Sequence, residues 1–497
     1  MNRIKICILA WLFLSIGSAN ARIDFNKPCN QSFDDIFKLK LPKAQIRLNA
    51  EIEKNPNNAY AYYLLGLQEI IDVFSSENEL KYKALKKSIP LRLKQIEKLG
   101  GKTAHTQFFK GQLLFYYGIT QTKFNDFFSA GSNIRDSYLT LKNNAIKYPK
   151  FLPNNTIMGV IETFSGTAPA SFKWIINMFG VKASVKSGMN RISKMALASC
   201  DEDSDLKYYK LEAQIFQGGM YHLVLHNEKK GWEIINQCTN DWKTNLFSNY
   251  MRSSFLIKIG HIEQAIAVLS DKPSGTDYAD LKFLDYLMGV AKLSRLDTDA
   301  EAYLISFIET FKGRHYLKSA CQKLAWHYLI NGDYANYKKY MAKISTLGYE
   351  FTDEDKQAAN SSKNTSIPNI SLLRARLLFD GGYYERSYKE LEGKSNKNYS
   401  ELRDQVEFIY RLARISQKGK KHVMAIDYFK KCMTLGKILP NYFAMASSIE
   451  IGSIYEEQGN LAQAKLYYTK ALGFYKNKEY VNSLEQRAKA GLSRMNN

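Results

Sequence analysis

Residues 449–472 read IEIGSIYEEQGNLAQAKLYYTKAL, and this stretch decides the fold. Two segments with helical periodicity flank a short turn, and a small residue stands in each of them, Gly452 and Ala464. Small side chains at these positions let two helices cross closely, because interior packing leaves no room for larger ones. Tyr455 and Tyr468 are then expected to fill the space against the neighbouring unit. The stretch therefore predicts a pair of antiparallel helices.

The order of small and aromatic residues in this stretch resembles the L-G-x2-Y and A-x3-F pattern of the tetratricopeptide (TPR) repeat. Ala471 extends the pattern, and Gly459 stands in the turn, where glycine takes the left-handed conformation without steric strain. The resemblance implies an all-α, TPR-like α-solenoid of antiparallel helix pairs.

Weaker copies of the same pattern occur upstream and cover most of the chain. In each copy a small residue stands where two helices would cross, and a glycine often stands in the following turn, such as Gly419. The other residues expected to pack the repeats are Gly66, Gly111, Ala213, Ala265, Ala325, Ala375, Ala413, Ala425 and Phe429.

The first 21 residues have the pattern of an export signal. Arg3 and Lys5 precede an apolar stretch at 6–16, and Ala19-Asn20-Ala21 supplies small residues at a cleavage site. We therefore expect an exported protein in the periplasm or at the outer-membrane periphery of a Gram-negative bacterium, not transmembrane after cleavage. The alternatives are an uncleaved anchor or a buried first helix.

The remaining chain is expected to form two helical arrays. Residues 22–351 form an N-terminal array, irregular at 149–190, and the polar segment 352–369 forms a linker without helical periodicity. Residues 370–497 form a C-terminal TPR array that ends in a solvating cap helix, as open solenoid ends need. The arrays are either two separate blocks or one superhelix that stacks across the linker. The layout at 149–190 is similar to a eukaryotic TPR family linked to lipid droplets and inclusion-body clearance.

The formal net charge is +22, which favours anionic partners such as an anionic envelope component. A compositional origin is the alternative, because lysine exceeds arginine and is spread along the chain. Export argues against a nucleic-acid partner.

No catalytic, cofactor or metal motif is recognised in the sequence. Leu99 to Thr103 reads LGGKT, but residue 96 of the corresponding phosphate loop would have to be glycine and is Ile96. His222 and His226 stand four residues apart without the glutamate of a metalloprotease helix. The cysteines are widely spaced and fit neither a disulfide framework nor a zinc site. We therefore expect a protein that is not an enzyme and needs no cofactor or metal.

Two functions fit these observations. The first is a scaffold that binds a protein or peptide partner in the concave groove of the solenoid. The alternative is a glycan- or lipid-binding envelope protein, with Phe172, Trp174 and Phe179 as membrane or glycan contacts. These aromatic residues would otherwise belong to an apolar helix pair buried in the solenoid.

Overall fold

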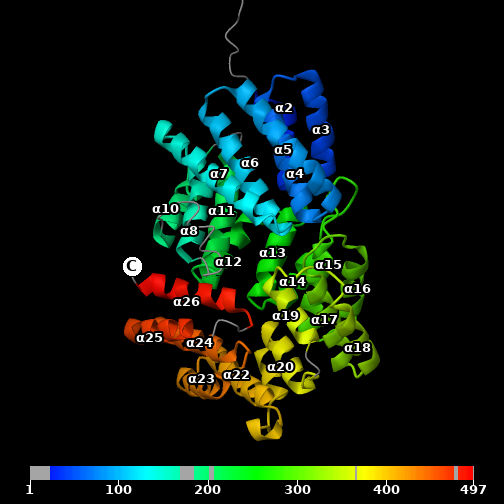
Figure 1. Cartoon of the computed structure of the whole chain (residues 1–497), viewed down its shortest axis with the longest axis vertical. Coiled ribbons are helices and arrows are strands. Elements are labelled where there is room, and N and C mark those ends of the chain that lie inside the picture. The colour runs from blue at the N-terminus through cyan, green and yellow to red at the C-terminus, as the bar shows by residue number, and fades with distance from the viewer. Residues whose placement is uncertain (1–22, 168–183, 201–205, 364–365, 475–478, 496–497) are drawn as a thin grey trace, which may run out of the picture.

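The computed structural model describes residues 23–167, 184–200, 206–363, 366–474 and 479–495. Over these residues it contains helices and no strand, which confirms the predicted all-α fold. Figure 1 shows the helices stacked along the long axis of the molecule. The expected signal segment 1–21 lies outside the described residues.

The helices of the N-terminal half are α2 (Lys27–Phe37), α3 (Leu41–Lys54), α4 (Ala59–Ser76), α5 (Glu79–Gly100), α6 (Ala104–Lys123), α7 (Phe127–Lys147), α8 (Asn154–Thr167), α10 (Val185–Ala196), α11 (Leu206–Leu223) and α12 (Glu228–Cys238). Those of the middle are α13 (Leu246–Lys258), α14 (Ile262–Ser270), α15 (Phe283–Arg295), α16 (Ala300–Thr310), α17 (Leu317–Ile330), α18 (Tyr334–Lys343) and α19 (Asp353–Ser362). The last are α20 (Ile370–Asp380), α21 (Tyr384–Lys389), the short 3-10 helix η2 (Asn396–Asn398), α22 (Leu402–Lys418), α23 (His422–Gly436), α24 (Phe443–Glu457), α25 (Leu461–Leu472) and α26 (Val481–Met495).

Successive helices pack as pairs, as the repeat pattern predicts. The pairs are α2 with α3, α4 with α5, α6 with α7, α8 with α10, α11 with α12, α13 with α14, α15 with α16, α17 with α18, α20 with α21, α22 with α23, and α24 with α25. The first helix of a pair is the more deeply buried one: α24 is buried on nearly all sides, whereas α25 buries one face. First helices therefore line the inside of the solenoid, and second helices form its outer layer.

Asparagine begins many of these helices. The side chains of Asn58, Asn78, Asn245, Asn369 and Asn460 each accept a hydrogen bond from a backbone N–H in the first turn of the helix that follows. A cap of this kind satisfies a donor that has no partner within the helix. The asparagine-rich composition thus sets local helix boundaries.

Left-handed residues mark the turns within the pairs. Four glycines, each in the turn between the two helices of a pair, have φ between 75° and 85°: Gly260, Gly332, Gly382 and Gly459. Gly419 differs, because its φ is −77° and the left-handed residue is Lys420, one position later. Gly419 therefore lies in the turn as predicted, and the residue after it takes the left-handed conformation.

The solenoid folds back on itself, so that units far apart in sequence touch. The backbone N–H of Ala279 donates to the carbonyl of Leu39 at 2.7 Å. Glu77, at the turn between α4 and α5, accepts hydrogen bonds from the backbone N–H groups of Arg314 and His315 at 2.8 and 3.0 Å. Burial opposes the charge of Glu77, but His315 and Lys123 lower the pKa of its carboxyl to about 2. A buried carboxylate therefore holds the turn between α4 and α5 against the segment that precedes α17.

The polar segment 352–369 was expected to lack a helix, and this was wrong for residues 353–362, which form α19. The carboxylate of Asp355 is fully buried and accepts from the backbone N–H groups of Tyr316 and Ser319 at 2.6 and 3.0 Å. These bonds cap the start of α17 and explain how a polar segment gains order. Beyond it, α20 packs on α15 and α17, so helices on both sides of the segment stack. The division into two independently folding blocks stays a prediction.

The C-terminal helix α26 does not serve as a solvating end, so this expectation was wrong. It packs on α24 and α25 and also contacts α8 of the N-terminal array. The guanidinium of Arg494 donates to the carbonyl of Leu225 at 3.0 Å. Figure 1 shows α26 beside the α8 and α12 region. The end of the chain thus closes onto the N-terminal half.

None of the described helices is both long enough and apolar enough to cross a membrane.

Candidate partner-binding surface

Charged and aromatic side chains, all of them buried or half-buried, meet between the helices of the C-terminal half. They come from α17, α20, α22, α24 and α26 and from two tyrosines that precede α24 and α26. We call this set the inner cluster. Its members are Lys323, Trp326, Arg376, Arg403, Glu407, Arg411, Arg414, Tyr442, Glu450, Tyr480 and Arg487.

Two cations of the inner cluster flank one indole ring. The ammonium of Lys323 lies 4.3 Å and the guanidinium of Arg376 5.0 Å from the centre of Trp326, which is 4% exposed. Burial and then the charge of Arg376 lower the pKa of Lys323 to about 8. The nearest carboxylate of Arg376 is that of Asp380, at 3.8 Å. Among the described residues no carboxylate forms an ion pair with Lys323. Asp380 therefore pairs with Arg376, and Lys323 is the cation of this pair that no carboxylate neutralises.

A buried carboxylate neutralises the next two arginines. Glu407 on α22 accepts from Arg411 at 2.8 Å and from Arg403 at 2.9 Å. Arg411 also donates to the hydroxyl of Tyr442 at 3.0 Å. Burial alone would raise the pKa of Glu407, but Arg403 and Arg411 hold it below its usual value. This part of the cluster is a closed, satisfied network.

A second carboxylate joins three helices. Glu450 on α24 accepts from Arg414 of α22 and from Arg487 of α26, each at 2.9 Å, and from Gln417 at 2.9 Å. Burial opposes its charge, yet Arg414 and Arg487 hold the pKa of Glu450 far below its usual value. Glu450 therefore fixes the relative positions of α22, α24 and α26.

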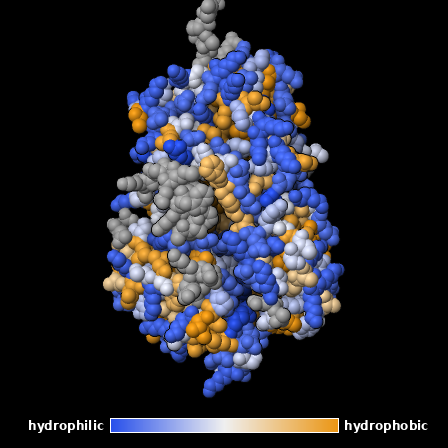
Figure 2. Space-filling view, in the orientation of Figure 1, coloured by the Kyte–Doolittle hydropathy of each residue, from blue (hydrophilic) through white to orange (hydrophobic). Residues whose placement is uncertain are grey.

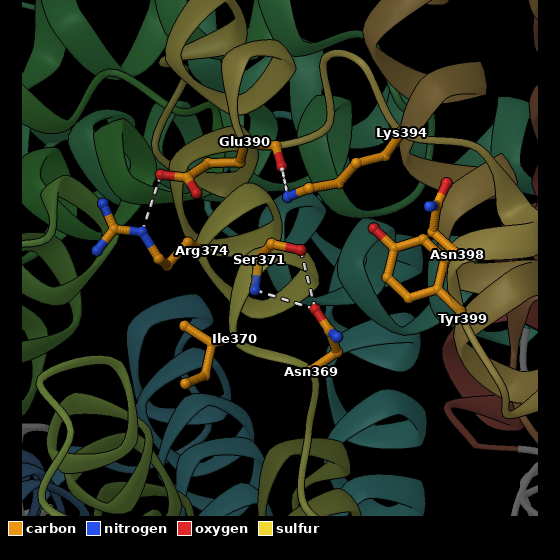
Figure 3. A pocket seen from close by; sticks show the side chains of 8 residues that line it. All are labelled: Asn369, Ile370, Ser371, Arg374, Glu390, Lys394, Asn398 and Tyr399. Carbon is orange, nitrogen blue, oxygen red and sulfur yellow. Dashed lines mark hydrogen bonds and ion pairs between the residues drawn. The ribbon is translucent and has the colours of Figure 1, made fainter.

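A polar hollow of about 620 Å³ lies at the start of α20 (Figure 3). Arg374 donates to Glu390 at 2.8 Å, and Lys394 donates to the carbonyl of Glu390 at 2.7 Å. Asn369, which also lines the hollow, caps the N-terminus of α20. Because both cations of the hollow already have partners, they are less available to a ligand than Lys323 is.

The residues predicted to pack the repeats lie in the cores of the arrays. A side-chain methyl group at Gly66, Gly111 or Gly452 would meet the neighbouring helix at 3.2, 2.6 and 2.9 Å, respectively. Phe429 is fully buried, and Tyr468 is only 1% exposed. The predicted alanines are also fully buried: Ala213, Ala265, Ala325, Ala375, Ala413, Ala425, Ala464 and Ala471.

The position of Tyr455 differs from the predicted one. It was expected to fill space against the neighbouring unit, but its half-buried ring stacks on Tyr467 of the same unit at 5.8 Å. Tyr468 takes the inter-unit position, since its ring lies against both Gly452 and Gly491 of α26. The adjacent residues Tyr467 and Tyr468, about 100° apart around α25, thus divide the two roles between them.

The predicted membrane or glycan contacts Phe172, Trp174 and Phe179 lie outside the described residues. Within the described ranges no group of three or more histidine, cysteine, aspartate or glutamate side chains is placed to hold a metal ion. His222 and His226 lie at the turn between α11 and α12, and burial lowers the pKa of both, that of His226 to about 3.

The sequence contained a signal for the inner cluster that the analysis of the repeats missed. Arg403, Glu407 and Arg411 follow one another at intervals of four residues, which places them on one face of a helix. Trp326 and Arg376, by contrast, lie 50 positions apart in the sequence and meet only because α20 packs on α17. Their contact depends on the tertiary structure.

Comparison with known proteins identifies the repeat in one part of the chain. The tetratricopeptide repeat model matches residues 447–478. None of the curated proteins matches the chain.

Three solved structures illustrate the likeness of the fold. The human IFIT1 dimer with PPP-AAAA has a TM-score of 0.34 and 11% identity, and covers 92% of this chain and 96% of that one. The P58(IPK) TPR domain has a TM-score of 0.21 and 13% identity over 94% and 98%. The APC/C hetero-tetramer Cut9-Hcn1 has a TM-score of 0.26 and 12% identity, and covers 92% of this chain and 95% of that one. These values are too low to carry an argument about function. The chain thus contains a tetratricopeptide repeat at residues 447–478, within an all-α fold that over its described residues is a TPR-like α-solenoid.

Proposed function

We propose that this protein is a non-enzymatic scaffold that binds a protein or peptide partner on the inner surface of its C-terminal half. Stacked helix pairs expose a long inner surface, and helical-repeat proteins use such surfaces to bind partners. The observation that supports the proposal is the pair Lys323 and Arg376 beside Trp326. Arg376 forms an ion pair with Asp380 at 3.8 Å, whereas Lys323 has no carboxylate partner among the described residues, so the set of interactions is incomplete at Lys323.

A partner with a carboxylate would complete this set. Arginine and lysine bind carboxylates by charge-assisted hydrogen bonds, and these are stronger in a partly dehydrated site. A nucleic acid fits the inner cluster less well, because Glu407 and Glu450 stand among its arginines and would repel successive phosphates. The mixed charges suit a peptide with acidic and uncharged residues.

The proposed place of action is the periplasm or outer-membrane periphery of a Gram-negative bacterium. The apolar stretch and the Ala19-Asn20-Ala21 sequence support this location. N-terminal sequencing of protein isolated from the envelope should show a mature chain that begins at Arg22. A chain in the envelope that begins at Met1 would contradict cleavage.

Crosslinking in cells with an inner-surface variant tests the scaffold function. The double variant Lys323→Gln, Arg376→Gln removes both cations, and Lys338→Gln, Lys339→Gln removes two exposed lysines of α18 as the matched control. After crosslinking, the full-length protein is purified and its partners are quantified by mass spectrometry.

We expect one or more proteins to be recovered equally with the wild type and the control, and at least about tenfold less with the inner variant, since a loss of one ion pair in a dehydrated site reaches this size. Circular dichroism melting verifies that both variants fold. If every crosslinked protein is recovered equally with both variants, the inner cluster is not the binding surface.

A further inference from the structure

The outward face of α5 carries a stripe of lysines and leucines. At 100° per residue, these side chains fall within a sector of about 100° of the helix circumference, and no residue in that sector is acidic. The members are Leu80, Lys83, Lys87, Leu91, Lys94 and Lys98.

The stripe is exposed along its whole length. Leu80 is 75% and Leu91 64% exposed, and the four lysines are exposed as well. The opposite face of α5 is buried in the array through Tyr82, Leu85 and Ile89. Two large apolar side chains in water on one helix face are unfavourable unless something covers them.

The lysines of the stripe have no acidic partners. Among the described residues, no carboxylate forms an ion pair with Lys83, Lys87, Lys94 or Lys98, whereas Lys81, outside the stripe, pairs with Asp72 at 2.8 Å. The acidic residues of α5 also point away from the stripe, since Glu79 pairs with Arg314 and Glu97 with Lys110. The stripe therefore keeps its full positive charge.

The next second helix, α7, repeats this arrangement. Phe128 is 74%, Leu139 36% and Ile146 72% exposed. Arg135 and Lys142 stand among them, and all five residues fall within about 60° of the circumference, again without an acidic residue. Two successive outer helices thus combine exposed apolar and basic side chains.

The two helices that carry the stripes begin close together. The hydroxyl of Tyr82 donates to the carboxylate of Asp126, the residue before α7, at 3.1 Å, and Tyr82 stacks on Phe124. The two helices therefore start at the same edge of the array. Figure 2 shows separate hydrophobic patches among hydrophilic side chains over the N-terminal helices. We call the residues of both stripes the outer basic surface.

We propose that the outer basic surface docks on a bilayer of anionic lipids. Lysine and arginine are attracted to anionic headgroups, and leucine, isoleucine and phenylalanine beside them insert into the boundary between headgroups and acyl chains. A nucleic acid would use the cations but not the exposed aliphatic side chains. This inference is independent of the partner proposed for the inner cluster, because the two surfaces share no residue.

Binding to vesicles tests the proposal. The full chain is sedimented with vesicles of phosphatidylcholine alone and with vesicles that also contain phosphatidylglycerol, at low and high salt. We expect stronger binding to the anionic vesicles, weakened by salt because screening shortens the range of the attraction. The variant Lys83→Gln, Lys87→Gln, Lys94→Gln, Lys98→Gln should bind anionic vesicles roughly 600-fold more weakly, since each of the four cations near such a surface contributes about a fivefold factor.

A matched control carries the same change in charge elsewhere: Lys338→Gln, Lys339→Gln, Lys421→Gln, Lys430→Gln, at four exposed positions on α18, α23 and the turn before it. It should bind like the wild type. Every chain retains residues 1–21, so any binding by that apolar segment is common to all and does not produce a difference. Equal weakening in both variants would show that only net charge matters, and would overturn the proposal.

A second variant tests the apolar contribution. Leu91→Gln, Ile146→Gln should reduce binding to anionic vesicles about tenfold at high salt, and Val423→Gln, Leu466→Gln, which changes residues that are 86% and 55% exposed on α23 and α25, should not. If the wild type binds soluble polyglutamate through the four stripe lysines and shows no preference for anionic vesicles, the surface binds an acidic protein and the lipid proposal is wrong.

Discussion

The outer basic surface and the inner cluster are both rich in cations, but they differ in what surrounds these cations. Inside, the cations are mostly arginines, and Glu407 and Glu450 each bridge two of them. Outside, they are mostly lysines that face water without a carboxylate, next to exposed leucines. Arginine suits the buried position because its planar group forms several directed hydrogen bonds at once.

The difference separates charge that holds the fold together from charge that is free to attract a partner. A net charge of +22 does not distinguish the two. The inner arginines are neutralised locally, so the long-range field comes largely from the outer lysines. Within the inner cluster, Lys323 resembles the outer cations because no carboxylate of the described residues forms an ion pair with it, whereas Arg376 pairs with Asp380.

Removing the carboxylate of Glu450 should have the largest effect on stability. The substitution Glu450→Gln leaves Arg414 and Arg487 with reduced exposure and no charged partner, and breaking such a pair costs about 3 kcal/mol. The midpoint of urea unfolding, followed by circular dichroism, should fall accordingly. Glu385→Gln, at an exposed position of α21, is the control and should leave the midpoint unchanged. Equal midpoints for the two variants would mean that the inner arginines do not need neutralisation.

Replacing Lys323 should change the free energy of unfolding by a smaller amount and should increase it. Its folded pKa of about 8 lies below the ordinary lysine value of about 10.4, so the unfolded chain binds this proton more tightly. The stability of the wild type should therefore rise between about pH 8 and pH 10. Lys323→Met should raise the free energy of unfolding at pH 7 by about 1 kcal/mol and should abolish the part of the pH dependence that this amine causes. Urea titrations at pH 7 and pH 9.5 measure both; an unchanged slope with pH would contradict the prediction.

The outer lysines should affect stability least. The fourfold lysine-to-glutamine variant of α5 should change the free energy of unfolding by less than about 0.5 kcal/mol per site, because exposed residues without partners contribute little. Thermal melting at low and high salt measures this. A large loss of stability would show that the stripe serves the fold and not a partner.

The C-terminal array was the most predictable part of the fold, and the reason is local. The small residues Gly452 and Ala464 and the turn residue Gly459 lie within one helix pair, so one stretch of sequence records both helices and their crossing. The polar helix α19 was missed because its order comes from elsewhere. Asp355 is held by the backbone of α17, which the sequence of the segment itself does not show.

The two charged surfaces were predictable to different degrees. The lysines are spread along the whole chain, but four of them share one face of α5. Helical periodicity applied to the lysines would have revealed the stripe. The meeting of Lys323, Trp326 and Arg376 required the packing of α20 on α17 and had no counterpart in local spacing.

The contact between Arg494 and Leu225 bears on how the chain folds. It joins residues that lie 269 positions apart in the sequence. Because closing so long a loop is slow, we expect this contact to form late in folding. An ordinary solenoid folds by spreading from any unit to its neighbours, whereas this one has a last step that waits for its final helix. During synthesis the N-terminal array is complete well before α26 leaves the ribosome. The contact between α8 and α26 can therefore form only after α26 has been made.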